Sequence, residues 1–246
     1  MQLDFAAREL TIKLVYYGPA LSGKTTNLQA MHKLTSEGSH GRLMTLETRD
    51  DRTLFFDLLP LAVKAEGDLS LRIKLFTVPG QVIHASTRRL VLQGADGVAF
   101  IADSQLAEAE NNRVSFLDLR QNLKDNGLDL KKMPVVIQFN KRDLPGDTIR
   151  GDDEIADLAR HGREPVYKAV ATRGDGVIET FLGLVAMTWS RLDTDHNFSK
   201  KFNIRSDSFV ASLARQLGIT GDPQRLIDAS VGTDPRAATR RMESSR

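Results

Sequence analysis

A glycine-containing segment near the start of the chain has the residue types and spacing of a phosphate-binding loop. It reads Gly-Pro-Ala-Leu-Ser-Gly-Lys-Thr from Gly18 to Thr25 and fits the pattern G-x-x-x-x-G-K-[ST] between a strand-like run and a helical pattern. Backbone N–H groups at such a helix start favour an anion. Lys24 is expected to reach the β- and γ-phosphates, and the Thr25 hydroxyl to bind Mg²⁺. The predicted phosphate-binding residues are Gly18, Ala20, Leu21, Ser22, Gly23, Lys24, Thr25, Thr26 and Gly80.

A second polar cluster follows a later buried run. Asn140, Lys141 and Asp143 are expected at the carboxyl edge of a parallel sheet, where such sheets bind ligands. A fixed carboxylate there can accept two hydrogen bonds from guanine, whereas adenine lacks that pair of donors. Asp143 is the predicted guanine selector, Asn140 braces the loop, and the Lys141 stem lies along the base. Ala171 and Thr172 are placed to offer a backbone N–H to the guanine carbonyl. Taken alone, the segment Asn140–Asp143 would also fit a solvated polar turn.

Two further segments have residues suited to phosphoryl transfer. Gly80 can offer its N–H to a γ-phosphate, and the next residue, Gln81, is suited to orient an attacking water. Upstream, Arg52 is the candidate for stabilising charge on the transferring group, and Thr53 for a second hydroxyl ligand of Mg²⁺. The alternatives are a plain turn for the first segment and a solvated charged loop for the second. A chance match to the phosphate-loop pattern is disfavoured by its strand and helix flanks.

The order of apolar runs predicts the elements that position these residues. Short apolar runs alternate with longer amphipathic stretches, which is typical of an α/β protein with a mostly parallel sheet. The expected strands are Thr11–Tyr17, Leu43–Leu46, Leu69–Val78, Gly97–Ala102, Pro134–Asn140 and Val166–Val170. The expected helices are Thr25–Thr35, Thr53–Pro60, Gln105–Asn126, Asp152–Arg160 and Val177–Leu192, the third ending at Gly127.

The composition limits the classes of function. The 34 Lys and Arg residues nearly balance 32 Asp and Glu residues, so no electrostatic footprint for nucleic acid is present. The absence of cysteine excludes thiolate catalysis, disulfides and cysteine zinc sites. No apolar run reaches the length of a membrane span, and no secretory or lipidation signal is found. A cytoplasmic protein without a direct membrane anchor is expected.

The chain divides by composition into two parts. Residues 1–195 are expected to form one nucleotide-binding domain, and residues 196–246 a C-terminal extension. The extension has one helical pattern, Ser208–Leu217, followed by a tail that contains Pro, Gly and Ser and is expected to be flexible. An isolated helix of this length is marginal in water, so it is expected to dock, preferably on the domain's own surface.

These motifs resemble those of the MglA-type prokaryotic Ras-like GTPases, from about residue 11 to residue 192. The resemblance implies a Ras-like G domain, a three-layer sandwich with a mostly parallel sheet flanked by helices. It also implies a GTP/GDP switch of cell polarity or motility, read by effectors in its GTP state and recruited to a cell pole by partners. The segments that carry it are Gly18–Thr25, Asp51–Asp57, Thr77–Gln81, Ala102–Gln105 and Asn140–Pro145.

The resemblance further implies how hydrolysis is stimulated. A roadblock-domain, MglB-like partner would accelerate GTP hydrolysis without inserting an arginine, which leaves the cationic role to Arg52. Thr77 replaces the aspartate that GTPases generally use around Mg²⁺, and MglA-type proteins share this replacement. The extension is a departure from the family, whose typical members end near the last domain helix.

Two other functions compete with a slow GTPase switch. One is a nucleotide-stabilised polarity scaffold with negligible turnover, in which GTP is a fixed structural ligand. The other is a phosphate-loop kinase of a small metabolite, which is disfavoured because Asn140–Asp143 would then have no purpose.

Overall fold

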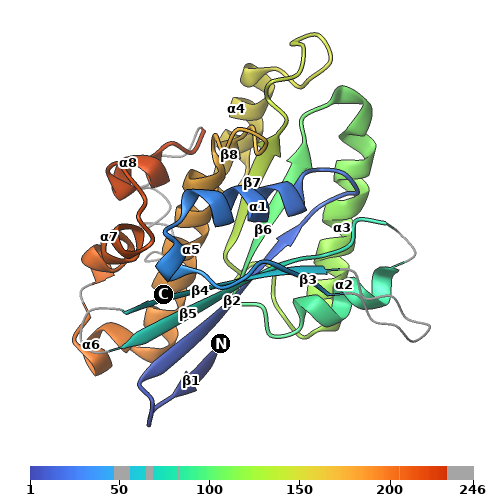
Figure 1. The fold of residues 1–246 in the computed structure, drawn as a ribbon. Coiled ribbons are helices and arrows are strands. Elements are labelled where there is room, and N and C mark those ends of the chain that lie inside the picture. The colour runs from blue at the N-terminus through green and yellow to red at the C-terminus, as the bar shows by residue number, and fades with distance from the viewer. Residues whose placement is uncertain (47–55, 65–68, 82–83, 205, 232–246) are drawn as a thin grey trace.

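The computed structural model describes residues 1–46, 56–64, 69–81, 84–204 and 206–231, which form an eight-stranded sheet with helices on both faces (Figure 1). The strand order is β3-β4-β5-β2-β6-β7-β8, and β1 pairs with β2 outside this path. The five strands from β5 to β8 run parallel, whereas β1, β3 and β4 pair antiparallel. This mostly parallel sheet between helical layers confirms the predicted fold class.

The strands are β1 (Gln2–Asp4), β2 (Glu9–Tyr17), β3 (Met44–Leu46), β4 (Phe56–Lys64), β5 (Ser70–Thr77), β6 (Gly97–Asp103), β7 (Val135–Asn140) and β8 (Val166–Lys168). The helices are α1 (Lys24–Leu34), α2 (Ala85–Leu92), α3 (Ala109–Asp125), α4 (Asp152–His161), α5 (Val177–His196), α6 (Phe198–Phe202), α7 (Ser206–Gln216) and α8 (Pro223–Asp228). Two short 3₁₀ turns, η1 (Glu37–Ser39) and η4 (Leu106–Glu108), complete the described elements.

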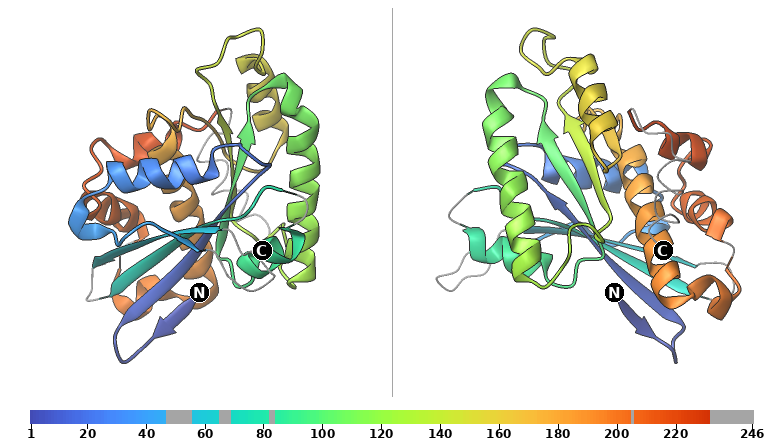
Figure 2. Two further views of the ribbon diagram at one scale, coloured as in Figure 1. Left: turned by 45° about the vertical axis from the view of Figure 1, so that its right-hand side comes forward. Right: turned by 180° about the vertical axis from the view of Figure 1, so that it is seen from behind.

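Each face of the sheet has its own apolar cluster. The first lies under α1, α5 and the C-terminal helices, and the second lies under α2, α3 and α4 (Figure 2). Strand β2 supplies both, because side chains alternate along a strand. Leu14 and Tyr16 belong to the first cluster, and Val15 and Tyr17 to the second. A strand buried on both faces reads as a continuous apolar run, which is why the sequence predicted it.

The six predicted strands are present, with small shifts of their ends, but one predicted helix is wrong. The segment Thr53–Pro60 was expected to be helical, and its described part belongs to strand β4. This strand pairs with β5 from Leu58 opposite Phe76 to Lys64 opposite Ser70. Its short apolar run fits either a helix or a strand, so pairing with β5 decides its conformation.

The C-terminal extension contains three short helices within its described part, where the sequence predicted one. Phe209 of α7 stacks on Trp189 of α5 with ring centroids 3.8 Å apart and an interplanar angle of 9°. The Leu217 carbonyl accepts a hydrogen bond from the Ser36 N–H at 2.8 Å. Tyr167 donates its hydroxyl to a carbonyl of α8 at 3.0 Å. The extension therefore docks on its own domain, as expected. Helix α5 ends at His196, one residue beyond the predicted domain boundary at residue 195.

No helix within the described ranges combines the length and apolar character needed to cross a bilayer.

Candidate functional site

The predicted phosphate loop joins β2 to α1 in a conformation that requires glycine at two positions. Gly18 and Gly23 have φ angles of 145° and 97°. A Cβ on Gly18 would lie 2.2 Å from the Ile101 carbonyl oxygen, and one on Gly23 would lie 2.1 Å from Nδ2 of Asn140. Leu21 also has a positive φ of 60° and its side chain is 88% exposed. The chain thus turns sharply into the N-terminus of α1, where N–H groups favour an anion.

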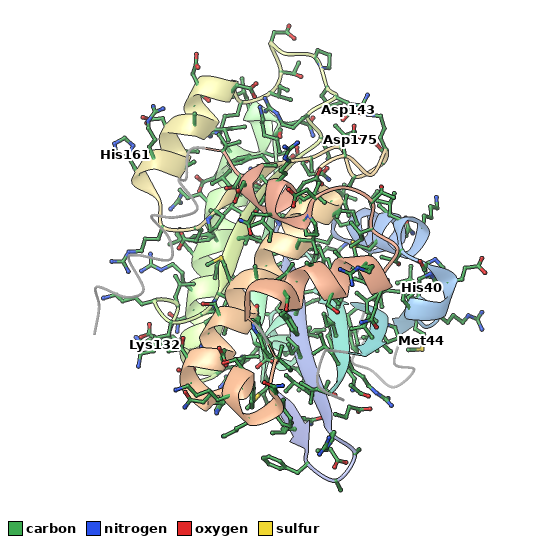
Figure 3. All side chains as sticks on the ribbon, turned by 90° about the vertical axis from the view of Figure 1, so that its left-hand side faces the viewer. His40, Met44, Lys132, Asp143, His161 and Asp175 are labelled. Carbon is green, nitrogen blue, oxygen red and sulfur yellow. The ribbon has the colours of Figure 1, made fainter. Side chains whose placement is uncertain are left out.

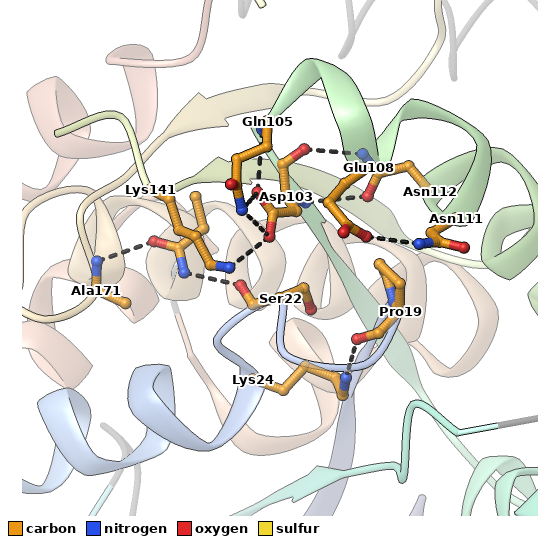
Figure 4. Close-up of polar contacts among 11 residues, drawn as sticks. Pro19, Ser22, Lys24, Asp103, Gln105, Glu108, Asn111, Asn112, Lys141 and Ala171 are labelled. Carbon is orange, nitrogen blue, oxygen red and sulfur yellow. Dashed lines mark hydrogen bonds and ion pairs between the residues drawn. The ribbon is translucent and has the colours of Figure 1, made fainter. Parts of the chain in front are cut away.

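Lys24 lies across this loop with a buried side chain. Its Nζ donates to the Gly18 carbonyl at 3.0 Å and to the Pro19 carbonyl at 2.6 Å, the second of which is drawn in Figure 4. Burial and, to a smaller extent, the positive charge of Arg88 lower the pKa of Lys24 to about 8, against an opposing effect of Asp57. A phosphate beside this ammonium would favour its charged form. The loop therefore holds a desolvated cation at the position where the sequence predicts phosphate binding.

A carboxylate that the sequence analysis did not select lies beside Thr25. Asp57 of β4 is buried, and its Oδ2 accepts hydrogen bonds from the hydroxyls of Thr25 at 2.6 Å and Thr77 at 3.0 Å. Its Oδ1 accepts from the Thr45 hydroxyl at 2.9 Å. Such an all-oxygen set is of the kind that Mg²⁺ prefers. Asp57 thus places a carboxylate beside the Thr77 hydroxyl, where the sequence analysis noted a threonine in place of an aspartate.

The sequence contains a signal that could have selected Asp57. Along β4, Asp57, Leu59, Leu61 and Val63 are buried and alternate with more exposed residues. As a strand, this pattern places the carboxylate on one face with three apolar residues, at the end nearest the loop. The helix prediction for this segment concealed that alternation.

The turn after β5 rests directly on the phosphate loop. A Cβ on Gly80 would lie 2.3 Å from the Ala20 nitrogen and 2.6 Å from the Pro19 carbonyl carbon. Only glycine allows this backbone-to-backbone approach. Gln81 follows with an exposed side chain. The structure therefore brings the predicted Gly80 to the loop and leaves the Gln81 side chain at the surface.

Arg88 of α2 holds this turn by a hydrogen bond and links it to α3. Its guanidinium donates to the Gln81 carbonyl, and its Nε donates to Oδ2 of Asp118 on α3 at 2.7 Å. The Tyr17 hydroxyl donates to the same carboxylate oxygen, and Asn122 donates to that hydroxyl at 3.1 Å. Burial and the hydrogen bond to Asp118 raise the pKa of Tyr17. This network, which the sequence analysis missed, links the turn to β2 and α3.

At the predicted guanine site, Asn140 joins two loops. Its Nδ2 donates to the Ser22 carbonyl at 2.9 Å, and its Oδ1 accepts from the Ala171 N–H at 2.9 Å (Figure 4). This is the bracing role that the sequence predicted for Asn140. The Ala171 N–H, however, is committed to Asn140 and is not free for a base carbonyl. Of the two predicted N–H donors, Thr172 is the one left for that contact.

The predicted guanine selector lies at the surface. Asp143 is exposed (Figure 3). Its carboxylate has no hydrogen-bond or ion-pair partner among the residues that the structure describes. Lys141 precedes it with a left-handed φ of 67° and an ion pair to Asp103.

Two predicted site residues, Arg52 and Thr53, lie outside the described residues.

Comparisons with known proteins find relatives of this chain. The chain is 44% identical to the mutual gliding-motility protein MglA of Myxococcus xanthus over 190 residues, which cover 77% of this chain and 96% of that protein. It is 26% identical to ADP-ribosylation factor-like protein 6 of Caenorhabditis elegans over 178 residues, covering 70% of this chain and 84% of that protein. No protein-family model matches the chain.

Proposed function

The chain belongs to the MglA family of Ras-like small GTPases, and on this premise we propose that it is a switch that binds GTP and GDP and hydrolyses GTP slowly. Its GTP form would be recognised by effectors that control cell polarity or motility. The similarity to a protein named for mutual gliding motility supports this choice of process. The output of such a switch is its nucleotide state rather than its product.

The observation that carries the proposal is the bond from Asn140 to the phosphate loop, because it holds a base site and a phosphate site at a fixed separation. The exposed Asp143 carboxylate would then accept two hydrogen bonds from guanine. Charge-assisted bonds contribute about 1.5–3 kcal/mol each, enough to separate GTP from ATP by orders of magnitude. Titration with labelled GTP and ATP tests this, and comparable affinities would exclude a guanine site. Asp143→Asn should shift the preference toward xanthine nucleotides.

Mg²⁺ is the proposed cofactor, held by Thr25 and Asp57, with Thr53 as a further hydroxyl ligand. The hydroxyl and carboxylate oxygens of the first two residues lie 2.6 Å apart, and this donor set suits a hard cation. When bound, the cation would neutralise charge on the phosphates. Membership of the GTPase family supports Mg²⁺ as the cofactor, and the adjacent hydroxyl and carboxylate oxygens support Thr25 and Asp57 as its ligands.

We assign hydrolysis to Gln81, which would orient the attacking water, and to Arg52, which would neutralise charge on the transferring phosphoryl group. A roadblock-domain partner would stimulate turnover. Arginines in this role are worth on the order of 10³–10⁵ in rate. Partner-stimulated single-turnover hydrolysis by Arg52→Ala tests the assignment, and a loss below about tenfold would contradict it on that scale. Gln81→Leu should retain bound GTP without losing affinity.

The same single-turnover assay separates a switch from a nucleotide-stabilised scaffold. A scaffold would bind GTP with the same guanine preference and show no turnover with or without a roadblock partner. Nucleotide-dependent capture of partners is expected only for the switch. A fluorescent fusion that loses its polar position when the partner is deleted would support recruitment to a pole by partners.

A further inference from the structure

A buried carboxylate holds the lysine of the guanine-side segment. Asp103 is the last residue of β6, and its side chain is 2% exposed, whereas that of Lys141, directly after β7, is 29% exposed. The Lys141 ammonium forms an ion pair with Oδ2 of Asp103 (Figure 4). Within the described part of the chain, no other cation lies within ion-pair distance of Asp103. The buried charge is thus compensated by the one lysine beside the proposed base site.

Asp103 is itself held from two sides. Its Oδ1 accepts hydrogen bonds from the Gln105 backbone N–H at 3.0 Å and from Nε2 of the same residue at 3.2 Å. Asn112 of α3 brackets its backbone, accepting from the Asp103 N–H at 3.0 Å and donating to the Asp103 carbonyl at 2.8 Å (Figure 4). A carboxylate with this many fixed partners can hold a flexible cation in one position.

The backbone of Lys141 is fixed as well. Asp103 pairs with Asn140 in the parallel register of β6 and β7, so the carboxylate stands at the adjacent strand end. Lys141 then adopts a left-handed φ of 67°, which few residues other than glycine do. Because the side chain is held at both ends, its four methylenes form a preformed apolar surface. A free lysine would lose rotamer freedom on binding a ligand, whereas this one has lost it already.

The segment that carries Asp143 is attached to the same strand end. After Asp143, the chain passes beside the residues that follow Asp103, and two backbone hydrogen bonds join the two segments. Arg150 donates its backbone N–H to the Ser104 carbonyl at 2.8 Å, and Leu106 donates its own to the Thr148 carbonyl at 2.9 Å. The end of β6 therefore supports both sides of the proposed base site.

We propose that Asp103 is a positioning residue for the guanine nucleotide, which holds the Lys141 stem against the base and thereby slows nucleotide release. This inference rests on the proposed guanine site. The competing explanation is an ion pair that serves only the fold. Buried ion pairs are weak evidence for stability, since apolar replacements are often neutral, which favours a role in the geometry of the site.

The test measures the release of fluorescent GDP into excess unlabelled GDP for the full chain. Asp103→Asn keeps the size and one acceptor but removes the charge, and it should accelerate release about ten- to a hundredfold, the range for one charge-assisted hydrogen bond. Lys141→Met keeps the apolar stem without the ammonium and should act similarly. The double variant should release GDP no faster than the faster single variant, because both changes break one interaction. The matched control is Glu108→Gln, which should release GDP at the wild-type rate.

Two results would overturn the proposal. Release from Asp103→Asn at the wild-type rate excludes a positioning role, and so do single effects that multiply in the double variant, because Asp103 would then act independently of Lys141. If Asp103→Asn does not fold, Asn112→Ala serves instead. Among the described residues, the Asn112 side chain forms its hydrogen bonds with the Asp103 backbone, so its loss should also speed release. Wild-type protein that binds ADP as tightly as GDP would contradict the guanine site itself, whatever the variants do.

Discussion

Replacement of Phe209 by alanine is expected to loosen the C-terminal extension as a unit. Phe209 and Trp189 are each 2% exposed, and their rings are stacked between α7 and α5. They share the first apolar cluster with Leu213 and Leu217 of the extension and with Leu61 of β4. Loss of the Phe209 ring would leave a cavity where the extension meets the domain.

The magnitude follows from burial. Truncation of a buried phenylalanine to alanine costs about 3–5 kcal/mol. For a chain of this size, 1 kcal/mol lowers the thermal midpoint by about 2–4 °C. The expected fall for Phe209→Ala is therefore roughly 6–20 °C.

The chain contains its own probe for this experiment. Trp189 is its single tryptophan, so its emission should shift to longer wavelength as the stacked ring is lost and water enters. Thermal unfolding is followed by this emission and by circular dichroism. The control is Phe5→Ala, because Phe5 is 69% exposed and its loss should change stability by no more than about 0.5 kcal/mol. Wild-type midpoint and emission in Phe209→Ala would refute the docking of α7 on α5.

Three further outcomes are expected. EDTA should accelerate GDP release from the wild type, and in Asp57→Asn this acceleration should be about tenfold smaller, because one charge-assisted bond is lost. An EDTA effect as large as in the wild type would exclude Asp57 from the cation site. Gly80→Ala should lower stability by about 1–3 kcal/mol, measured by urea unfolding, because its Cβ would meet the Ala20 backbone. The pKa of Lys24 lies at about 8 in the free protein and should rise beside a phosphate, so GDP binding should take up protons at pH 9 and none at pH 6.5. Calorimetry in buffers of different ionisation enthalpy checks this, and equal uptake at both pH values would contradict it.

Much of the site can be predicted from sequence because its requirements are local. The phosphate loop depends on glycines at fixed spacing between an apolar run and a helix, and the positive φ angles of Gly18 and Gly23 meet that requirement. The end of α3 is equally local: Gly127 has a φ of 70°, and the Leu128 N–H donates back to the Leu123 carbonyl at 2.8 Å. Strands buried on both faces were found for the same reason.

Residues that act through distant partners could not be found in this way. Asp57 reaches the hydroxyls of Thr25 and Thr77 only because β4 pairs with β5. Asp103 meets Lys141 only because β6 and β7 are neighbours.

The sequence by itself therefore determined the turn from β2 into α1 at Gly18–Thr25, the positions of the parallel strands along the chain, and the placement of Asn140–Asp143 at a strand end. It did so because backbone dihedral preferences, apolar periodicity and the carboxyl-edge rule apply within short segments. The tertiary structure alone decided that Phe56–Lys64 is a strand, that the Ala171 N–H is used by Asn140, and that three helices of the extension pack on the domain. These outcomes depend on hydrogen bonds and buried surface between segments far apart in the chain, which no local pattern specifies.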